Sequence, residues 1–142
     1  MPTGFQELKA GRGFAGRLEN GTDLVEEIER FCAEQGVVAA QVTVIGAVSK
    51  AAFAFYEQDD HRYLELWSDT HHEIVGFTGN ISLRDDRPFL HAHATFADAT
   101  GAAVGGHLLR GCEVFVAEVM IREITGVELV RHPDAATGLA LW

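Results

Sequence analysis

The sequence predicts an α+β domain, in which a curved antiparallel β-sheet carries one main α-helix packed on it. One segment near the start repeats apolar residues at helical spacing, whereas most later segments show strand patterns rich in β-branched and aromatic residues. Turns rich in Gly, Asn and Asp separate these strand segments, as in hairpins. At 142 residues the chain is expected to form a single domain over residues 1–142.

The helix is the best-defined element. A short edge strand is expected around residues 14–18, and the helix then begins at Asp23, which forms a D-x-x-E capping box with Glu26. Gly36 is expected to end it as a left-handed cap. Helical spacing gathers one apolar stripe, made of Leu24, Val25, Ile28, Phe31 and Cys32. Four glutamates are expected to face water, namely Glu26, Glu27, Glu29 and Glu34.

The rest of the chain is expected to be almost entirely strand. Segment 72–83 is long enough for one bent strand, with Gly76 and Gly79 expected as bulges or as sites of close backbone approach. The other expected strands span residues 37–45, closed by Gly46, then 51–56, 63–67, 90–96, 104–109, 112–124 and 128–131. The tail at 132–142 ends in Leu139, Leu141 and Trp142, so it is expected to pack on its own domain or on a neighbouring subunit.

Charge and hydropathy restrict the partners. The 21 acidic and 11 basic side chains give a formal net charge of −10, with no basic run. Because nucleic-acid affinity comes largely from Lys and Arg at the phosphates, direct nucleic-acid binding is not expected. No apolar run approaches the roughly 18 residues of a membrane span, and no secretory leader is evident, so we expect no membrane contact and a cytoplasmic location. Cys32 and Cys112 are expected to be buried, reduced thiols.

The strongest functional signal is a histidine motif. Apolar residues at 90, 92, 94 and 96 place His91 and His93 on one face of a half-buried strand, roughly 6.6 Å apart at the backbone. His107 follows a short turn that could return it to the same face. Three neutral imidazoles are a common zinc set that leaves a fourth coordination position open. We therefore predict a zinc site at His91, His93 and His107; the alternative is that these histidines line a polar cavity without a metal.

Further residues could support such a site. A metal-bound imidazole needs its second nitrogen oriented by a carboxylate or carbonyl, and Asn80, Thr95 and Glu113 are the candidates. The remaining histidines are expected in exposed turns or polar loops, namely His61, His71, His72 and His132. Trp67 and Phe77 are expected to be core or interface side chains.

Four segments in a fixed order add a family resemblance. They are 17–21 (RLENG) before the helix, 46–48 (GAV) after an apolar strand, 73–83 (EIVGFTGNISL), and 88–93 (PFLHAH) followed by 105–108 (GGHL). Together they resemble the plant and prokaryote conserved domain, the PPC domain, over about residues 12–126. The tail at 132–142 follows this core.

The resemblance implies a compact α+β fold that assembles as a homotrimer, and a zinc ion held by histidines matching His91, His93 and His107. In plants this domain accompanies AT-hook motifs, which bind the minor groove of A·T-rich DNA. An AT-hook needs a Gly-Arg-Pro core with basic flanks. Here the nearest string, Gly11-Arg12-Gly13, lacks the proline and is expected to be a loop, so no DNA-binding residue is assigned.

Three functions are compatible with the sequence. The first is a trimeric zinc-binding module whose role the sequence does not define; a regulatory role associated with DNA through a partner is one option. The second is a zinc-dependent hydrolase or lyase that uses the open coordination position, with Asp98 and Glu73 as candidate general bases. The third is a scaffold that binds other proteins through its trimer. A cupin-like oxygenase is disfavoured because Ala97 stands where that family's glutamate follows the histidine pair.

Overall fold

The computed structural model describes residues 4–142 and confirms the predicted α+β class, an antiparallel sheet with one helix. The helix is α1 (Leu24–Gln35), and a separate two-stranded ribbon is formed by β8 (His132–Pro133) and β9 (Ala140–Leu141). The seven strands of the main sheet are β1 (Lys9–Leu18), β2 (Ala40–Glu57), β3 (Arg62–Ser68), β4 (His72–Arg84), β5 (Arg87–Ala97), β6 (Ala103–Leu108) and β7 (Glu113–Thr125).

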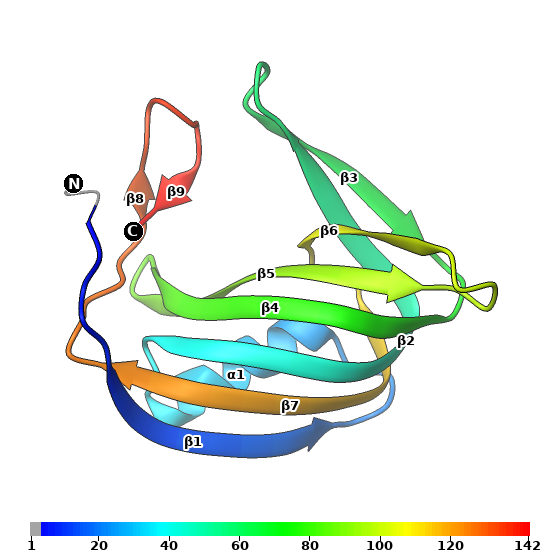
Figure 1. Cartoon of the computed structure of the whole chain (residues 1–142), viewed down its shortest axis with the longest axis horizontal. Coiled ribbons are helices and arrows are strands. Elements are labelled where there is room, and N and C mark those ends of the chain that lie inside the picture. Colours follow the sequence, from blue (N-terminus) through cyan, green and yellow to red (C-terminus); the bar gives the residue numbers. More distant parts are fainter. Residues whose placement is uncertain (1–3) are drawn as a thin grey trace.

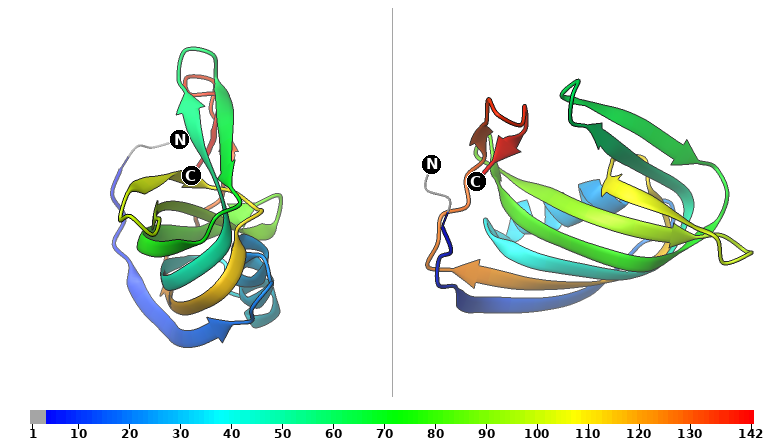
Figure 2. Two further views of the ribbon diagram at one scale, coloured as in Figure 1. Left: turned by 90° about the vertical axis from the view of Figure 1, so that its right-hand side faces the viewer. Right: turned by 45° about the horizontal axis from the view of Figure 1, so that its top comes forward.

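The long strand β2 organises the sheet. Its first part pairs with β7 and β4, and its second part pairs with β3 and β6. Since β4 also pairs with β5, and β5 with β6, the sheet curls until β6 meets β2 again. Figures 1 and 2 show the strong curvature, with the β2–β3 hairpin and the β8–β9 ribbon rising from the two ends of the sheet.

The prediction of two strands at 37–45 and 51–56 was wrong, because β2 runs unbroken through Gly46. Its register shifts twice against β7, between Ala47 and Val48 and between Val48 and Lys50. These bulges interrupt the alternation of inward and outward side chains. The four side chains at 51–54 are all buried, so the two-residue alternation of buried and exposed side chains is lost in this part of the strand.

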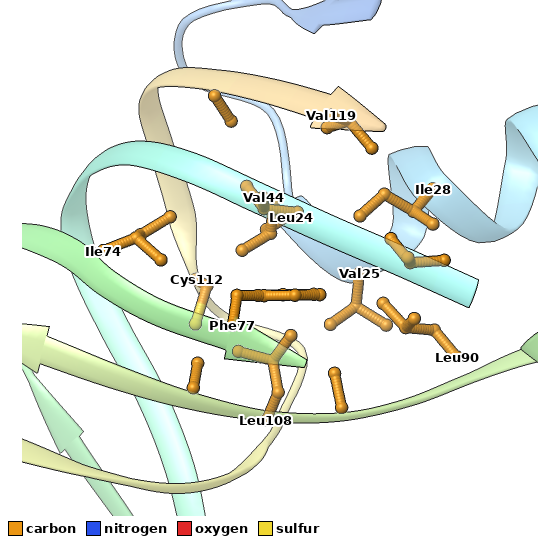
Figure 3. Close-up of a cluster of buried hydrophobic side chains, with 14 of the residues drawn as sticks. Leu24, Val25, Ile28, Val44, Ile74, Phe77, Leu90, Leu108, Cys112 and Val119 are labelled. Atoms are coloured by element: carbon orange, nitrogen blue, oxygen red, sulfur yellow. The ribbon is translucent and has the colours of Figure 1, made fainter. Parts of the chain in front are cut away.

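The helix follows its sequence signals closely. The Asp23 carboxylate accepts hydrogen bonds from the backbone N–H groups of Val25 and Glu26, and Gly36 ends the helix at a left-handed φ of 67°. The predicted apolar stripe faces the sheet, with Phe31 half-buried at its edge. Figure 3 shows Leu24, Val25 and Ile28 meeting strand side chains such as Val44, Phe77 and Leu90. Burial of this stripe against the sheet is what stabilises a helix of this length.

Two of the four helix glutamates contact residues outside the helix, whereas Glu27 and Glu34 pair with Arg30 within it. Glu29 accepts a hydrogen bond from the backbone N–H of Leu90 at 3.0 Å and from Arg110 at 2.6 Å. Glu26 pairs with the same arginine at 3.1 Å and does not close the capping box. The prediction for Glu29 was wrong because helical periodicity does not reveal that the start of β5 passes beneath this side chain. Glu29 therefore ties α1 to the strand that carries the histidine pair.

Other sequence predictions need correction at the chain ends. The string at 11–13, expected to be a loop, lies in β1 at a register shift. Segment 128–131, expected to be a strand, makes only an isolated parallel bridge from Val130 to Leu83. Both segments pair with strands distant in sequence, and local patterns do not report such pairings.

Several side-chain predictions are confirmed. Cys32 and Cys112 are buried free thiols, and burial raises the pKa of each to about 11. Phe77 is in the core, whereas Trp67 is 68% exposed on β3 and is not a core residue of this chain. The helix α1 is neither long nor apolar enough to cross a membrane.

Candidate metal centre

The structure brings His91, His93 and His107 together. His91 and His93 project from the same face of β5, and His107 on β6 lies directly opposite His93 in the strand register. One potential ligand atom from each of the three lies within 4.8 Å of the other two. The ring centroids are 5.3 Å apart for His91–His93, 5.1 Å for His91–His107 and 5.7 Å for His93–His107. The expected return of His107 to the face of the H-x-H pair is thus observed.

Two glycines allow β6 to reach this position. A Cβ placed on Gly105 would lie 2.1 Å from the carbonyl oxygen of Ala94 on β5, and one on Gly106 would lie 2.5 Å from that of Ala54 on β2. No real Cβ approaches a backbone oxygen that closely. The Gly-Gly pair before His107 is therefore a steric requirement for inserting β6 between β5 and β2, and it positions the third histidine.

The opposite face of β5 holds the site in place. Leu90, Ala92, Ala94 and Phe96 are buried, so the strand is fixed against the core while its histidines face outward. This burial also fixes the register, because a shift of one residue would turn the imidazoles into the core. The glutamate–Leu90 hydrogen bond from α1 anchors the strand one residue before His91.

The environment keeps two of the imidazoles neutral. Burial lowers the pKa of His91 to about 4, with further lowering by the charges of Arg131 and His93. Burial also lowers the pKa of His107 to about 4, followed by the effects of His91, His93 and Arg131. A neutral imidazole keeps a lone pair on one nitrogen, which is the form that binds metal ions.

The donor set fits a small divalent cation. Zinc bound by imidazole has Zn–N distances of about 2.0–2.1 Å, so tetrahedral ligand nitrogens lie about 3.3 Å apart. Because the ligand atoms already lie within 4.8 Å, small side-chain rotations would bring them to that spacing. Three histidines would fill three positions of a tetrahedral zinc site and would leave a fourth position for another ligand.

Arg131 is a site residue that the sequence analysis missed. It lies after β7, and its guanidinium donates to Ser82 Oγ at 2.7 Å, to the Ala140 carbonyl at 3.0 Å and to Asn80 Oδ1 at 3.2 Å. Its Nη2 also lies 3.4 Å from His91 Nδ1. Arg131 thus links the β8–β9 ribbon to β4 and reaches the histidine cluster. No spacing rule connects residue 131 to residue 91, so the sequence held no signal for this contact.

The Arg131–His91 contact constrains the tautomer of His91. A guanidinium only donates, so a hydrogen bond at this point makes Nδ1 the acceptor and places the ring proton on Nε2. Coordination through Nε2 would instead require a proton on Nδ1, which would face the guanidinium N–H. Metal binding through Nε2 of His91 would therefore release this Arg131 N–H from the histidine.

The three supporting residues expected from the sequence do not orient the imidazoles. Asn80 lies opposite His91 in the register of β4 and β5, but its side-chain oxygen accepts from Arg131. Glu113 accepts from Ser49 Oγ at 2.7 Å. Thr95 lies on the same face of β5, and no hydrogen bond joins its hydroxyl to the three rings within residues 4–142.

The histidines lie in a cleft of about 590 Å³, called the histidine cleft below, which is also lined by Tyr56, Tyr63, Arg84, Phe89, Arg131 and Leu139. The Tyr63 ring stacks on His107, with centroids 4.8 Å apart. The Tyr56 hydroxyl donates to the Thr137 carbonyl at 2.6 Å and ties the β2–β3 hairpin to the C-terminal tail. The tail therefore packs on its own domain and forms one wall of this cleft.

The candidate general bases lie elsewhere. Glu73 and Asp98 border a separate cleft of about 360 Å³, called the end cleft below, at the start of β4 and the end of β5. Asp98 accepts hydrogen bonds from Thr100 Oγ1 at 2.7 Å and from the Thr100 backbone N–H at 2.8 Å, and these bonds lower its pKa. Asp98 organises a turn, and neither carboxylate lines the histidine cleft.

His72, expected to be exposed, is buried in the end cleft. Its Nδ1 lies 2.8 Å from the Thr70 carbonyl, and its ring packs edge-on against Phe96. His71 is exposed as expected. The difference follows from strand geometry, because adjacent residues of an extended chain point to opposite faces.

Residues 5–125 match the sequence model of the Plants and Prokaryotes Conserved (PCC) domain, the family written PPC above. The chain belongs to this family. The match covers the main sheet and α1 almost completely, and the family assignment made from the four sequence segments is confirmed.

Two archaeal proteins of known structure are similar to this PPC chain. The metal-containing protein AF0104 from Archaeoglobus fulgidus is 38% identical, with a TM-score of 0.93 over 99% of both chains. A plant- and prokaryote-conserved protein from Pyrococcus horikoshii is 33% identical, with a TM-score of 0.92 over 100% of this chain and 96% of that one. A putative DNA-binding protein from Bacteroides thetaiotaomicron, 24% identical with a TM-score of 0.84 over 94% of this chain and 95% of that one, shares the fold.

A match also occurs within larger proteins. The bifunctional protein GlmU of Synechococcus sp. (strain JA-2-3B'a(2-13)) is 36% identical over 125 residues, which are 86% of this chain. The chain spans only 18% of the length of that relative. The PPC fold thus occurs both as most of a chain and as one part of a much longer one.

Proposed function

We propose that this PPC chain is a trimeric metal-binding module, with zinc held by His91, His93 and His107. The observation that carries the proposal is the convergence of three imidazoles, with potential ligand atoms within 4.8 Å, at one side of a cleft. Burial and neighbouring charge lower the pKa of two of them, which favours the neutral ligand form. The archaeal relative that is 38% identical is described as metal-containing, which supports the same role here.

Zinc is the ion proposed because the donor set consists of imidazole nitrogens. Imidazole suits Zn²⁺ and other late first-row ions, whereas Mg²⁺ and Ca²⁺ prefer oxygen ligands. When bound, zinc would supply a Lewis-acidic fourth position. The residues of this chain would hold the three imidazoles in place through the buried face of β5 and the close approach of β6.

Elemental analysis tests the metal assignment. The purified chain is incubated with zinc, and unbound metal is then removed. The chain is expected to retain about one zinc ion per chain. His91→Ala is expected to lose it, whereas the matched control His71→Ala, an exposed histidine outside the cluster, is expected to keep it. Zinc content that is indifferent to His91→Ala would remove the assigned ligands.

The trimer is proposed from exposed apolar surface and from the family resemblance. Large apolar side chains lie exposed on β2, β3, β4 and β7, including Ile45 (64%), Trp67 (68%), Val75 (59%) and Phe115 (63%). Contiguous apolar patches on soluble chains usually mark interfaces. Sedimentation equilibrium is expected to give a trimer, and a concentration-independent monomer would contradict the assembly. If the exposed apolar surface instead bound another protein, the chain would sediment with that protein in a complex of mixed composition.

Direct DNA contact is not part of the proposal. The string at 11–13 has its arginine engaged, since Arg12 Nε and Nη2 donate to the Glu123 carboxylate at 2.7 Å each. With a net charge of −10, the chain is expected not to shift an A·T-rich duplex in a gel at moderate salt. A shift that weakens with Arg12→Gln would assign DNA binding to this string. If no shift is seen, any DNA-associated regulatory role would act through a partner protein.

The zinc-dependent hydrolase or lyase remains the second function. Its support is that three histidine ligands would leave a fourth coordination position on a zinc ion, and that the three histidines line a cleft. Against it, the two carboxylates considered as general bases lie in the end cleft, and the histidine cleft has no acidic lining residue in the described chain. Two results would favour the enzyme: a hydrolytic activity that is lost in His107→Ala, and an activity of the unmodified chain that is lost on metal removal and returns when zinc is added.

A further inference from the structure

The charge of the histidine cleft is opposite to that of the chain. The formal net charge is −10, from 21 acidic and 11 basic side chains. Yet the lining of this cleft includes Arg84 and Arg131 and, within residues 4–142, no Asp or Glu. A region of positive charge on an acidic chain concentrates anions and disfavours cations other than those held by specific ligands.

Arg131 is the centre of this charge. It is half-buried, and its hydrogen bonds go to neutral acceptors, namely Ser82 Oγ, Asn80 Oδ1 and the Ala140 carbonyl. No carboxylate of the described chain forms an ion pair with it. A cation that has lost hydration without gaining a counter-charge is stabilised by an incoming anion.

The guanidinium has hydrogen-bonding capacity left for that anion. It carries five N–H donors, and three of them serve Ser82, Asn80 and Ala140. One of the remaining two faces His91 Nδ1 at 3.4 Å, a long contact that metal binding through Nε2 would release. An oxyanion beside the histidines could therefore accept from Arg131 without breaking the bonds that hold the tail.

Apart from Gln58, the remaining side chains of the cleft lining are aromatic or aliphatic. Tyr63 lies over His107, and the Phe89 ring has Arg84 and Arg131 each 5.3 Å from its centroid. Leu139 and Leu141 of the tail complete this side. A volume of about 590 Å³ is in the range of small-molecule sites. These walls suit a ligand that carries an apolar body in addition to its anionic group.

We propose that the histidine cleft binds a small organic carboxylate with an apolar or aromatic body, whose carboxylate meets Arg131 beside the three-histidine centre. Planar guanidinium and planar carboxylate match in hydrogen-bond geometry. The inference rests on the proposed function in one respect, since the charge of a bound metal would add to that of Arg131. Arg84, which lies over the Phe89 ring, adds a second positive charge to the lining of the cleft.

Calorimetric titration of the zinc-loaded full chain tests the ligand class. Phenylacetate is the probe, phenylacetamide is its neutral match, and inorganic phosphate is an anion without an apolar body. Phenylacetate is expected to bind at least about tenfold more tightly than phenylacetamide, because charge-assisted hydrogen bonds are roughly twice as strong as neutral ones. Equal binding of acid and amide, or tighter binding of phosphate, would overturn the assignment.

Variants test the residue assigned. Arg131→Gln is expected to weaken phenylacetate binding by roughly ten- to a hundredfold with zinc content unchanged, and Arg131→Lys to weaken it less. Since Arg131 also holds the tail, Arg84→Gln provides a variant without that structural role, with an expected loss of roughly two- to fivefold. Arg122→Gln, an exposed arginine of β7 outside the cleft, makes the same change of charge and is expected to have no effect.

The outcomes separate this inference from the proposed function. Unchanged phenylacetate binding in both Arg131→Gln and Arg84→Gln would overturn the anion site while the zinc content stands. If the unmodified chain binds no zinc, the metal assignment fails and the same titrations on the metal-free chain decide the carboxylate site. Selective binding of phenylacetate over phenylacetamide would then support it, and equal binding would overturn it.

Discussion

The two clefts along β4 and β5 contain similar residues in different arrangements. The histidine cleft holds three imidazoles, two guanidinium groups and no carboxylate in the described chain. The end cleft holds His71, His72, Glu73 and Asp98. In the end cleft His72 Nδ1 already contacts a backbone carbonyl and Asp98 organises a turn, so these groups serve the fold. In the histidine cleft the three imidazole rings lie next to one another.

The spacing of histidines along a strand decides whether their side chains share a face and can meet at one site. His71 and His72 are adjacent, so their side chains point to opposite faces, and one is exposed while the other is buried. His91 and His93 are two residues apart and share a face. The third histidine is brought to that face only by the neighbouring strand β6.

The largest effect is expected from His107→Ala. It leaves the H-x-H pair of β5 intact but removes the ligand contributed by β6. We expect zinc affinity to fall by more than the roughly 10- to 100-fold typical of losing an outer-shell partner. A chelator competition titration measures it. The matched change in the end cleft, His72→Ala, is expected to leave the affinity unchanged, and an equal loss in both variants would erase the distinction between the clefts.

Gly105→Ala is expected to have the next largest effect. A Cβ there would lie 2.1 Å from the Ala94 carbonyl oxygen, so β6 must move away from β5. We expect a loss of about 2–3 kcal/mol in the free energy of unfolding, together with weaker zinc binding. Urea unfolding measures the first quantity. Gly16→Ala in β1, where a Cβ meets nothing within 4 Å, is the control and is expected to change stability by less than about 0.5 kcal/mol.

Acid is expected to destabilise the metal-free chain through the histidine cleft. The pKa values of His91 and His107 are lowered to about 4, below the ordinary value of 6.5. Below pH 6.5 the unfolded chain therefore binds protons that the folded chain does not, so the free energy of unfolding falls as pH drops from 6.5 toward 4. Urea unfolding at several pH values across this window measures the slope. The double variant His91→Gln/His107→Gln is expected to flatten it, and an unaltered slope would place the titrating groups elsewhere.

The smallest effect on the metal centre is expected from Asp98→Ala. Asp98 accepts three of its hydrogen bonds within the turn at 98–102, so its loss is expected to lower Tm slightly without altering zinc content. Asp98→Asn keeps an acceptor oxygen and is expected to retain more of the Tm. Loss of zinc in Asp98→Ala would mean that this carboxylate contributes to the metal centre and that the two clefts are not independent.

Features that depend on neighbouring residues could be predicted from the sequence, whereas contacts between distant segments could not. The helix with its Asp23 and Gly36 caps, the alternation at 90–96 and the buried cysteines were predictable, because each depends on neighbours in the chain. The single strand β2 was not, since bulges and burial on both faces removed its periodicity. Arg131 was missed and Glu29 misjudged, because their partners are many residues away.

The sequence by itself determined that His91 and His93 share a face, because the two-residue period of a strand is a local property of the backbone. It also provided the glycines before His107 that a close strand approach requires. Only the tertiary structure decided that β6 closes between β5 and β2, and that the tail brings Arg131 to the same cleft. These contacts join segments whose proximity depends on how the whole sheet curls, and the curl is fixed by the packing of β2, α1 and the core together.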